Sequence, residues 1–294
     1  MFYRGVIEDN NDPDKLGRVK VRVFGIHSDS EEDISTNDLP WSEVAYSLSF
    51  GNISGVGISS IPKQGSWVWC FCDKDIDNFV VFASCVGIHK EKESGAFCDK
   101  DSKYPLDDRL NEPDINRLAR GEKVSETEIE KSLKENQTKG VSTASSKTWD
   151  EPESKNSKAK YPYNNVLETE AGHTIQIDDT EGNERIHIYH KSGSYIEMRE
   201  DGSVIIKSAN DIYNISSGNF KESIASKSDT TINADQSVLV GGSLTESIGK
   251  DETKEISGQY DLSIGKSSSI SISMSGLYEC GAVNEIKGKI IKLN

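Results

Sequence analysis

Apolar residues are scarce in this chain. Hydrophobic residues make up 34% of its 294 residues, and the mean hydropathy is −0.58. No stretch approaches the roughly 18 consecutive apolar residues of a membrane-spanning helix, so we expect no such helix. The apolar content is also low for one large globular core. Part of the chain should therefore either stay unstructured or bury its apolar atoms against other chains.

Positive charge is also in short supply. The 34 Lys and Arg residues face 49 Asp and Glu residues, which leaves a formal net charge of −15. This excess of acidic residues argues against non-specific binding to nucleic acid or anionic lipid headgroups. The first residues, MFYRGVIEDNND, lack the apolar stretch of a secretory signal. We expect synthesis in a cytoplasm, no nucleic-acid partner, and transport elsewhere only as part of an assembly.

Neither the cysteines nor known catalytic motifs indicate a chemical site. An odd number of cysteines at irregular spacing does not form a disulfide framework. The cysteines are Cys70, Cys72, Cys85, Cys98 and Cys280. A metal site that combines some of them with His89 is the alternative, but the alternation of WVWCFC favours a buried strand in which cysteine acts as a small apolar residue. Phosphate loops, GxSxG elbows and HExxH motifs are absent. We predict no cofactor, no metal ion and no catalytic residue.

Residues 1–97 are predicted to form an OB-fold barrel. The segment RVKVRVF, residues 18–24, alternates strictly, which is typical of a half-buried antiparallel strand. About five such short strands, separated by turn-forming residues, fit a small barrel. Arg18, Lys20 and Arg22 form a basic stripe along this strand. OB folds often bind nucleic acid, but at this net charge we favour a solvated or subunit-facing surface.

Residues 98–163 are predicted to form a hydrophilic linker. They are rich in charged residues, Ser and Asn, and nearly free of β-branched runs. One short helix is expected within them. Ser125 and Glu128 have capping-box spacing, Ile129 and Leu133 share a helical face, and Glu130 precedes Lys134 by four residues.

Strand patterns return from residue 164. The segments TIQIDD, RIHIYH, SYIEMRE and SVIIKSA alternate and are separated by turn-forming residues. His187 and His190 lie three apart on one such strand, so they point to opposite faces and cannot jointly hold a metal ion. His173 is predicted to be a packed or hydrogen-bonded turn residue.

An aliphatic residue then recurs at every eighth position. The series is Ile224, Ile232, Val240, Ile248, Ile256, Ile264 and Ile272. Eight is an even number, so all seven side chains, which we call the ladder, point to one side of an extended strand. One large aliphatic per octad cannot close a core within one chain. A β-sandwich with coincidental spacing is the alternative. We favour an intertwined triple-stranded β-helix over residues 164–294, in an all-β homotrimer with the ladder on its axis.

Two stretches resemble a known family. GVIEDNNDPDKLGRVKVRVFGIH (Gly5–His27), with LPW (Leu39–Trp41), resembles the N-terminal OB domain of the central spike protein of T-even phage baseplates. Residues 148–208, beginning TWDEPESKNSKAKYPYNN, resemble the entry to the triple-stranded β-helix of those spikes. Type VI secretion spikes share this second pattern. The T-even spike also has a lysozyme domain between barrel and β-helix, whereas here the interval is short and polar, so no catalytic residue is carried over.

The resemblance implies a mechanical role. The expected protein is a homotrimeric central spike in the virion, whose barrels dock on a ring-shaped hub and plug the tail tube. Its C-terminal end would carry a separate tip protein, and contraction would drive it into the host outer membrane. The alternatives are a type VI or extracellular injection spike, a peptidoglycan hydrolase, and a receptor-binding fibre. An ion on the threefold axis is left open.

Overall fold

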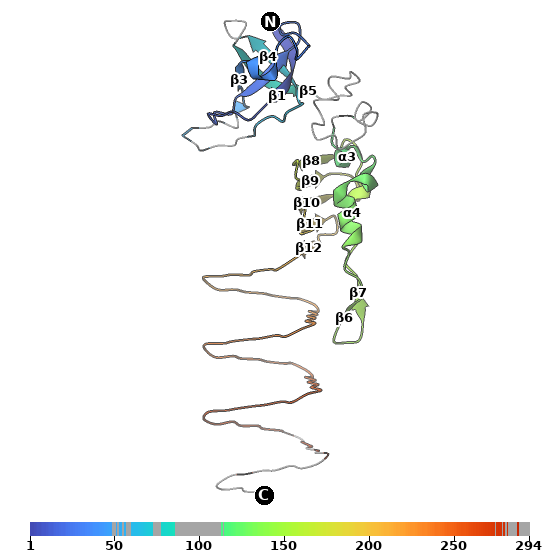
Figure 1. Ribbon diagram of the computed structural model, residues 1–294. Coiled ribbons are helices and arrows are strands. Elements are labelled where there is room, and N and C mark those ends of the chain that lie inside the picture. Colours follow the sequence, from blue (N-terminus) through green and yellow to red (C-terminus); the bar gives the residue numbers. More distant parts are fainter. Residues whose placement is uncertain are drawn as a thin grey trace. The chain divides into compact units, whose positions relative to one another are not determined.

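The structure is a computed structural model of the chain (Figure 1). The residues that it describes are 1–48, 51, 53–54, 56, 60–72, 78–85, 113, 115–273, 275–277, 279, 281 and 287. His89, Cys98 and Cys280 lie outside them, and so does nearly all of the segment expected to carry a tip protein. The chain divides into two compact units, residues 1–231 and 232–294. None of the helices in the described part is long and apolar enough to span a membrane.

Five strands near the N-terminus close into a barrel. The barrel consists of β1 (Phe2–Asp9), β2 (Val19–Val23), β3 (Trp41–Val44), β4 (Trp67–Cys72) and β5 (Phe79–Cys85). The strand order is β1-β2-β3-β5-β4, and β4 pairs with β1 to close it. β3 and β5 run parallel, while the other neighbours are antiparallel. This arrangement matches the predicted OB-fold barrel.

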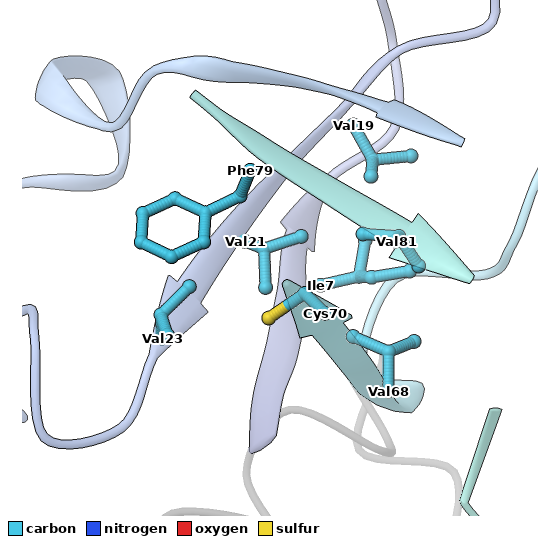
Figure 2. Close-up of a cluster of buried hydrophobic side chains, with 8 residues drawn as sticks. All are labelled: Ile7, Val19, Val21, Val23, Val68, Cys70, Phe79 and Val81. Carbon is cyan, nitrogen blue, oxygen red and sulfur yellow. The ribbon is translucent and has the colours of Figure 1, made fainter. Parts of the chain in front are cut away.

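The barrel interior is built from the alternating residues of these strands. Figure 2 shows the side chains that fill it, namely Ile7, Val19, Val21, Val23, Val68, Cys70, Phe79 and Val81. The three valines of RVKVRVF thus point inward, as their alternation predicts. Burial raises the pKa of the Cys70 thiol to about 11. Cys70 therefore behaves as a small apolar core residue.

The basic stripe of β2 is not solvated, contrary to one of the two expectations for it. Lys20 and Arg22 are only 7% and 2% exposed, because the loop that follows β2 covers them. Arg22 forms an ion pair with the buried Glu8, and its guanidinium also donates to the Ser28 carbonyl at 2.6 Å. The Lys20 ammonium donates to the carbonyl of Asn37 at 2.7 Å. These cations are engaged by acceptors of the same chain.

A second sheet follows later in the chain. It is an antiparallel meander of β8 (Asn164–Glu168), β9 (Thr174–Asp178), β10 (Arg185–Tyr189), β11 (Tyr195–Arg199) and β12 (Val204–Lys207). The four alternating segments predicted as strands correspond to β9–β12. Gly193 takes a φ of 93° in the tight turn between β10 and β11, a conformation that side chains other than glycine rarely adopt.

Residues 115–163 pack on one face of this sheet. Figure 1 shows their helices beside it. They contain α3 (Arg117–Arg120), η3 (Val124–Glu126), α4 (Glu128–Glu135), β6 (Val141–Ser142), β7 (Thr148–Trp149) and η4 (Asn156–Lys158). A shared core joins them to the sheet and includes Leu118, Val124, Ile129, Leu133, Tyr189 and Tyr195. The segment expected to be a linker is thus, in its described part, a cover for the sheet.

The helix predicted in this segment is α4, but its cap differs from the prediction. Thr127 is the N-cap, and its hydroxyl accepts from the Glu130 amide, because residues 124–126 form a 3₁₀ turn that places Ser125 outside the helix. Ile129 and Leu133 point into the core as predicted. In α3, Gly121 ends the helix at a φ of 66°, and a side chain there would collide with the Ala159 carbonyl.

Candidate assembly interface

The sheet of β8–β12 exposes its aliphatic face. The large apolar side chains on this face are between 39% and 66% exposed. They are Leu167, Ile175, Ile177, Ile186, Ile188, Ile196, Met198, Val204 and Ile206. We call this set the aliphatic face. Such a large contiguous apolar surface marks a site that another surface covers.

Strand register arranges the aliphatic face in two rows across the sheet. In one row Leu167, Ile175, Ile188, Ile196 and Ile206 are successive partners on β8–β12. In the other row the successive partners on β9–β12 are Ile177, Ile186, Met198 and Val204. Cross-strand neighbours on one face are in contact. The face is therefore a continuous apolar surface rather than a set of scattered side chains.

The opposite face of the sheet is polar and buried. Gln176 accepts hydrogen bonds from Arg185 at 2.6 Å and from the Asn164 side chain at 3.0 Å. The Asn164 amide also donates to the Leu118 carbonyl at 3.1 Å, which ties the sheet to α3. Gln176 in turn donates to the Asn156 side chain at 3.2 Å. The polar face thus satisfies much of its hydrogen bonding against the covering segment 115–163.

His187 lies fully buried in this polar layer. Its burial, together with the nearby charges of Arg185 and Arg199, lowers the pKa of His187 to about 3. The imidazole is therefore neutral at neutral pH, and it packs edge-on against Tyr195. His173, predicted to be a packed turn residue, lies against the ring of His190 with centroids 4.4 Å apart. In the described part of the chain, no group of three or more metal-binding side chains comes together.

Beyond β12 the backbone bends at a fixed interval. Paired bends lie at residues 209–210, 217–218, 225–226, 233–234, 241–242, 249–250, 257–258 and 265–266. The spacing is eight residues throughout, and each ladder residue from Ile224 to Ile264 directly precedes a pair of bends. The octad of the sequence is thus also a period of the backbone.

Ladder side chains differ from the other aliphatic residues in this region. The seven ladder residues are 42–52% exposed, whereas the remaining large aliphatic residues between 209 and 273 are 58–96% exposed. The six from Ile224 to Ile264 take the same position relative to the bends, and all seven are partly shielded. The backbone thus treats them as one set, and their place on a trimer axis stays a prediction.

The backbone of residues 209–273 forms no strand pairing within the chain, and its hydrogen bonds are a few contacts with nearby serine side chains. No backbone-to-backbone hydrogen bond joins residues of this described stretch, and every residue beyond Ala209 is exposed. Each of these residues carries an amide donor and a carbonyl acceptor, and both need hydrogen-bond partners when they are buried. Extended backbone with unpaired amides and carbonyls is a template on which strands of another chain can pair.

Comparison with known proteins agrees with this architecture. A family model described as the Gp5 N-terminal OB domain matches residues 25–163. The protein Gp5 of Vibrio phage KVP40 is 34% identical over 281 residues, which cover 84% of this chain and 66% of that protein. The chain is therefore similar to the Gp5 proteins, in the OB-domain match and over most of its own length. The pre-baseplate central spike protein Gp5 of Enterobacteria phage T4 is 37% identical over 132 residues, 42% of this chain and 22% of that protein.

This chain thus spans slightly under two thirds of the first Gp5 relative and about a fifth of the second.

The octad pattern predicted the ladder, but the aliphatic face was not predicted. Its signal was present in TIQID, RIHIY and YIEMR, where Ile and Met alternate with Gln, His and Glu. Alternation alone does not say which set is buried, and we had no reason to expect a polar segment to cover the polar side.

Proposed function

We propose that three copies of this chain form the central spike of a contractile phage tail baseplate, within the virion. The observation that carries the proposal is the bent, extended segment 209–273, whose backbone makes no backbone-to-backbone hydrogen bond within the chain and whose ladder side chains are 42–52% exposed. Similarity to the Gp5 proteins supports the same role, since the T4 relative is named as a central spike protein.

Threefold symmetry completes both unpartnered surfaces. In a three-sided prism each octad forms one side, so a chain makes one turn every three octads. The strands of the other two chains then lie between its successive turns and pair with its free amides and carbonyls. The ladder converges on the axis, and the aliphatic faces of three sheets cover one another above it. Burial of each ladder isoleucine contributes roughly 1.5–3 kcal/mol.

Mechanical rigidity follows from this construction. Every strand is hydrogen-bonded to two neighbours, no edge is left open along the prism, and the axis is dry. Contraction of the sheath would push such a spike through the host outer membrane. In the same proposal the N-terminal barrels trimerise, plug the tail tube and dock on a ring-shaped hub protein, and a separate tip protein is carried at the C-terminal end.

We propose no enzymatic role. A glycosidase holds two carboxyl groups about 5–9 Å apart across a substrate cleft. In the covering segment the two buried acids are instead used in ion pairs, Glu130 with Lys134 at 3.2 Å and Glu151 with Lys207 at 2.6 Å. A cell-wall clearing assay distinguishes the hydrolase alternative. The identity of the neighbouring genes distinguishes a type VI or extracellular injection spike from a phage spike. A receptor-binding fibre would be recovered with the detached tail fibres rather than with the baseplate.

The copy number in purified virions tests the proposal. Isotope-labelled standard peptides from residues 1–85 and 225–273 should quantify three copies of the chain per particle, retained in purified baseplates. A closed ring of three chains on the tail axis allows no other number. Recovery with detached tail fibres, or at a higher multiple, would contradict the proposed role.

A further inference from the structure

A hairpin projects from the covering segment beyond the β12 end of the sheet (Figure 1). It spans residues 138–150, which we call the arm, and its strands are β6 and β7. Trp149 pairs with Val141 across the two strands and is 49% exposed, and residues 144–150 are exposed throughout. A two-stranded hairpin alone is marginally stable at best in water. The arm therefore needs a surface to lie on.

The root of the arm is fixed at the end of β12. Glu151 accepts hydrogen bonds from the Lys207 ammonium at 2.6 Å and from the Thr138 amide at 2.8 Å, and also from the Tyr195 hydroxyl. Burial opposes ionisation of Glu151, but these hydrogen bonds outweigh it and lower its pKa. The Gln137 side chain donates to the Glu151 carbonyl at 2.7 Å. The arm thus starts where the bent segment starts.

The far end of the arm meets the same chain three octads later. The hydroxyl of Thr231 donates a hydrogen bond to the carbonyl of Ser142 in β6. Thr231 lies 24 residues after Lys207, which anchors the root of the arm. In the proposed prism, 24 residues make one complete turn. The arm therefore bridges two successive turns of its own chain on one side of the prism.

Two strands from other chains lie between those turns. On each side of a three-chain prism the strands follow one another in the order first, second and third chain, before the first chain returns. An arm that connects Lys207 with Thr231 must cross the outer surface of one octad from each partner subunit. By threefold symmetry these are residues 209–216 of one partner and 217–224 of the other.

The side chains at this crossing match the arm. Within an octad, residues at odd distances from the ladder position point outward, as Thr231 does before Ile232. Between residues 209 and 273 only three large apolar residues occupy outward positions, namely Tyr213, Ile215 and Leu239. Two of the three lie in the first octad, which the arm crosses first. Outward positions of the later octads, Leu239 aside, are small, polar or charged.

We propose that the arm is an interchain clamp. Its Trp149 and Val141 cover Tyr213 and Ile215 of the partner subunit and hold the entrance of the β-helix closed. The inference rests on the proposed trimer and adds to it a specific contact between the covering segment of one protomer and the first octads of its neighbours.

Photocrosslinking of the full chain tests the clamp. With Trp149 replaced by the photoreactive residue p-benzoylphenylalanine, irradiation should give covalent dimers and trimers on a boiled gel. Peptide mapping of these bands should join position 149 to residues 209–224 of another protomer. The matched control carries the same residue at Tyr161, which is 65% exposed and lies outside the arm. It should give no link to residues 209–224.

The oligomeric mass of the same sample separates the clamp from the trimer. In a sample that light scattering shows to be trimeric, links confined to one chain, links to other regions, or no links would overturn the clamp alone. Equal crosslinking to residues 209–224 from the Tyr161 position would also overturn it. A monomeric sample would overturn both the clamp and the proposed spike.

Discussion

Ile248→Asp should prevent trimer formation. In the proposed prism the three copies of this side chain meet on a dry axis, and burying a charge there without a partner costs several kcal/mol per chain. Three carboxylates would also repel one another at close range. Light scattering should find monomers or aggregates in place of trimers, and an unheated SDS gel should show no slow-migrating band.

Leu239→Asp is the matched control for this variant. Leu239 belongs to the same bent segment, is 96% exposed and occupies an outward position directly before the ladder residue Val240. The same substitution there should leave the trimer and its SDS resistance intact, because the new carboxylate stays in water. Normal trimers from Ile248→Asp, or equal damage from both variants, would show that the ladder does not line an axis.

Insertion of one serine between Ile248 and Ile256 should damage the trimer to a comparable degree. A shift of one residue turns every later inward side chain outward, so Ile256, Ile264 and Ile272 would leave the axis. The expected result is loss of SDS resistance and rapid proteolysis of the segment after residue 248.

An insertion of eight residues controls for chain length. Duplication of residues 249–256 adds one octad and keeps every later ladder residue in phase. The duplicated chain should trimerise normally and give a longer spike. If the one-residue insertion is tolerated as well as the eight-residue insertion, the octad has no structural role in assembly.

Local patterns predicted the elements of this chain well where one face of a strand is apolar and faces inward. The valines of RVKVRVF fill the barrel because alternation and burial coincide there. The octad of the ladder likewise reappears as the interval between backbone bends. Both patterns are repeated along the sequence, so neither depends on contacts between distant segments.

Predictions failed where distant segments decide the environment. Lys20 and Arg22 look solvated in sequence, but carbonyl acceptors of the loop after β2 and the Glu8 carboxylate of β1 bury them. Hydropathy also gives no indication that the polar residues 115–163 pack on a polar sheet face, since Gln176 is buried by its hydrogen bonds to Asn156 and Asn164 rather than by apolar contact. Tertiary structure settles both cases.

The solution mass of the purified chain tests the central claim most directly. Light scattering should give a single species of about 97 kDa, three times the chain mass of 32.4 kDa, and the species should resist SDS until it is boiled. A 32.4 kDa monomer that unfolds cooperatively would mean that the octads are completed within one chain. That result would contradict the trimeric spike.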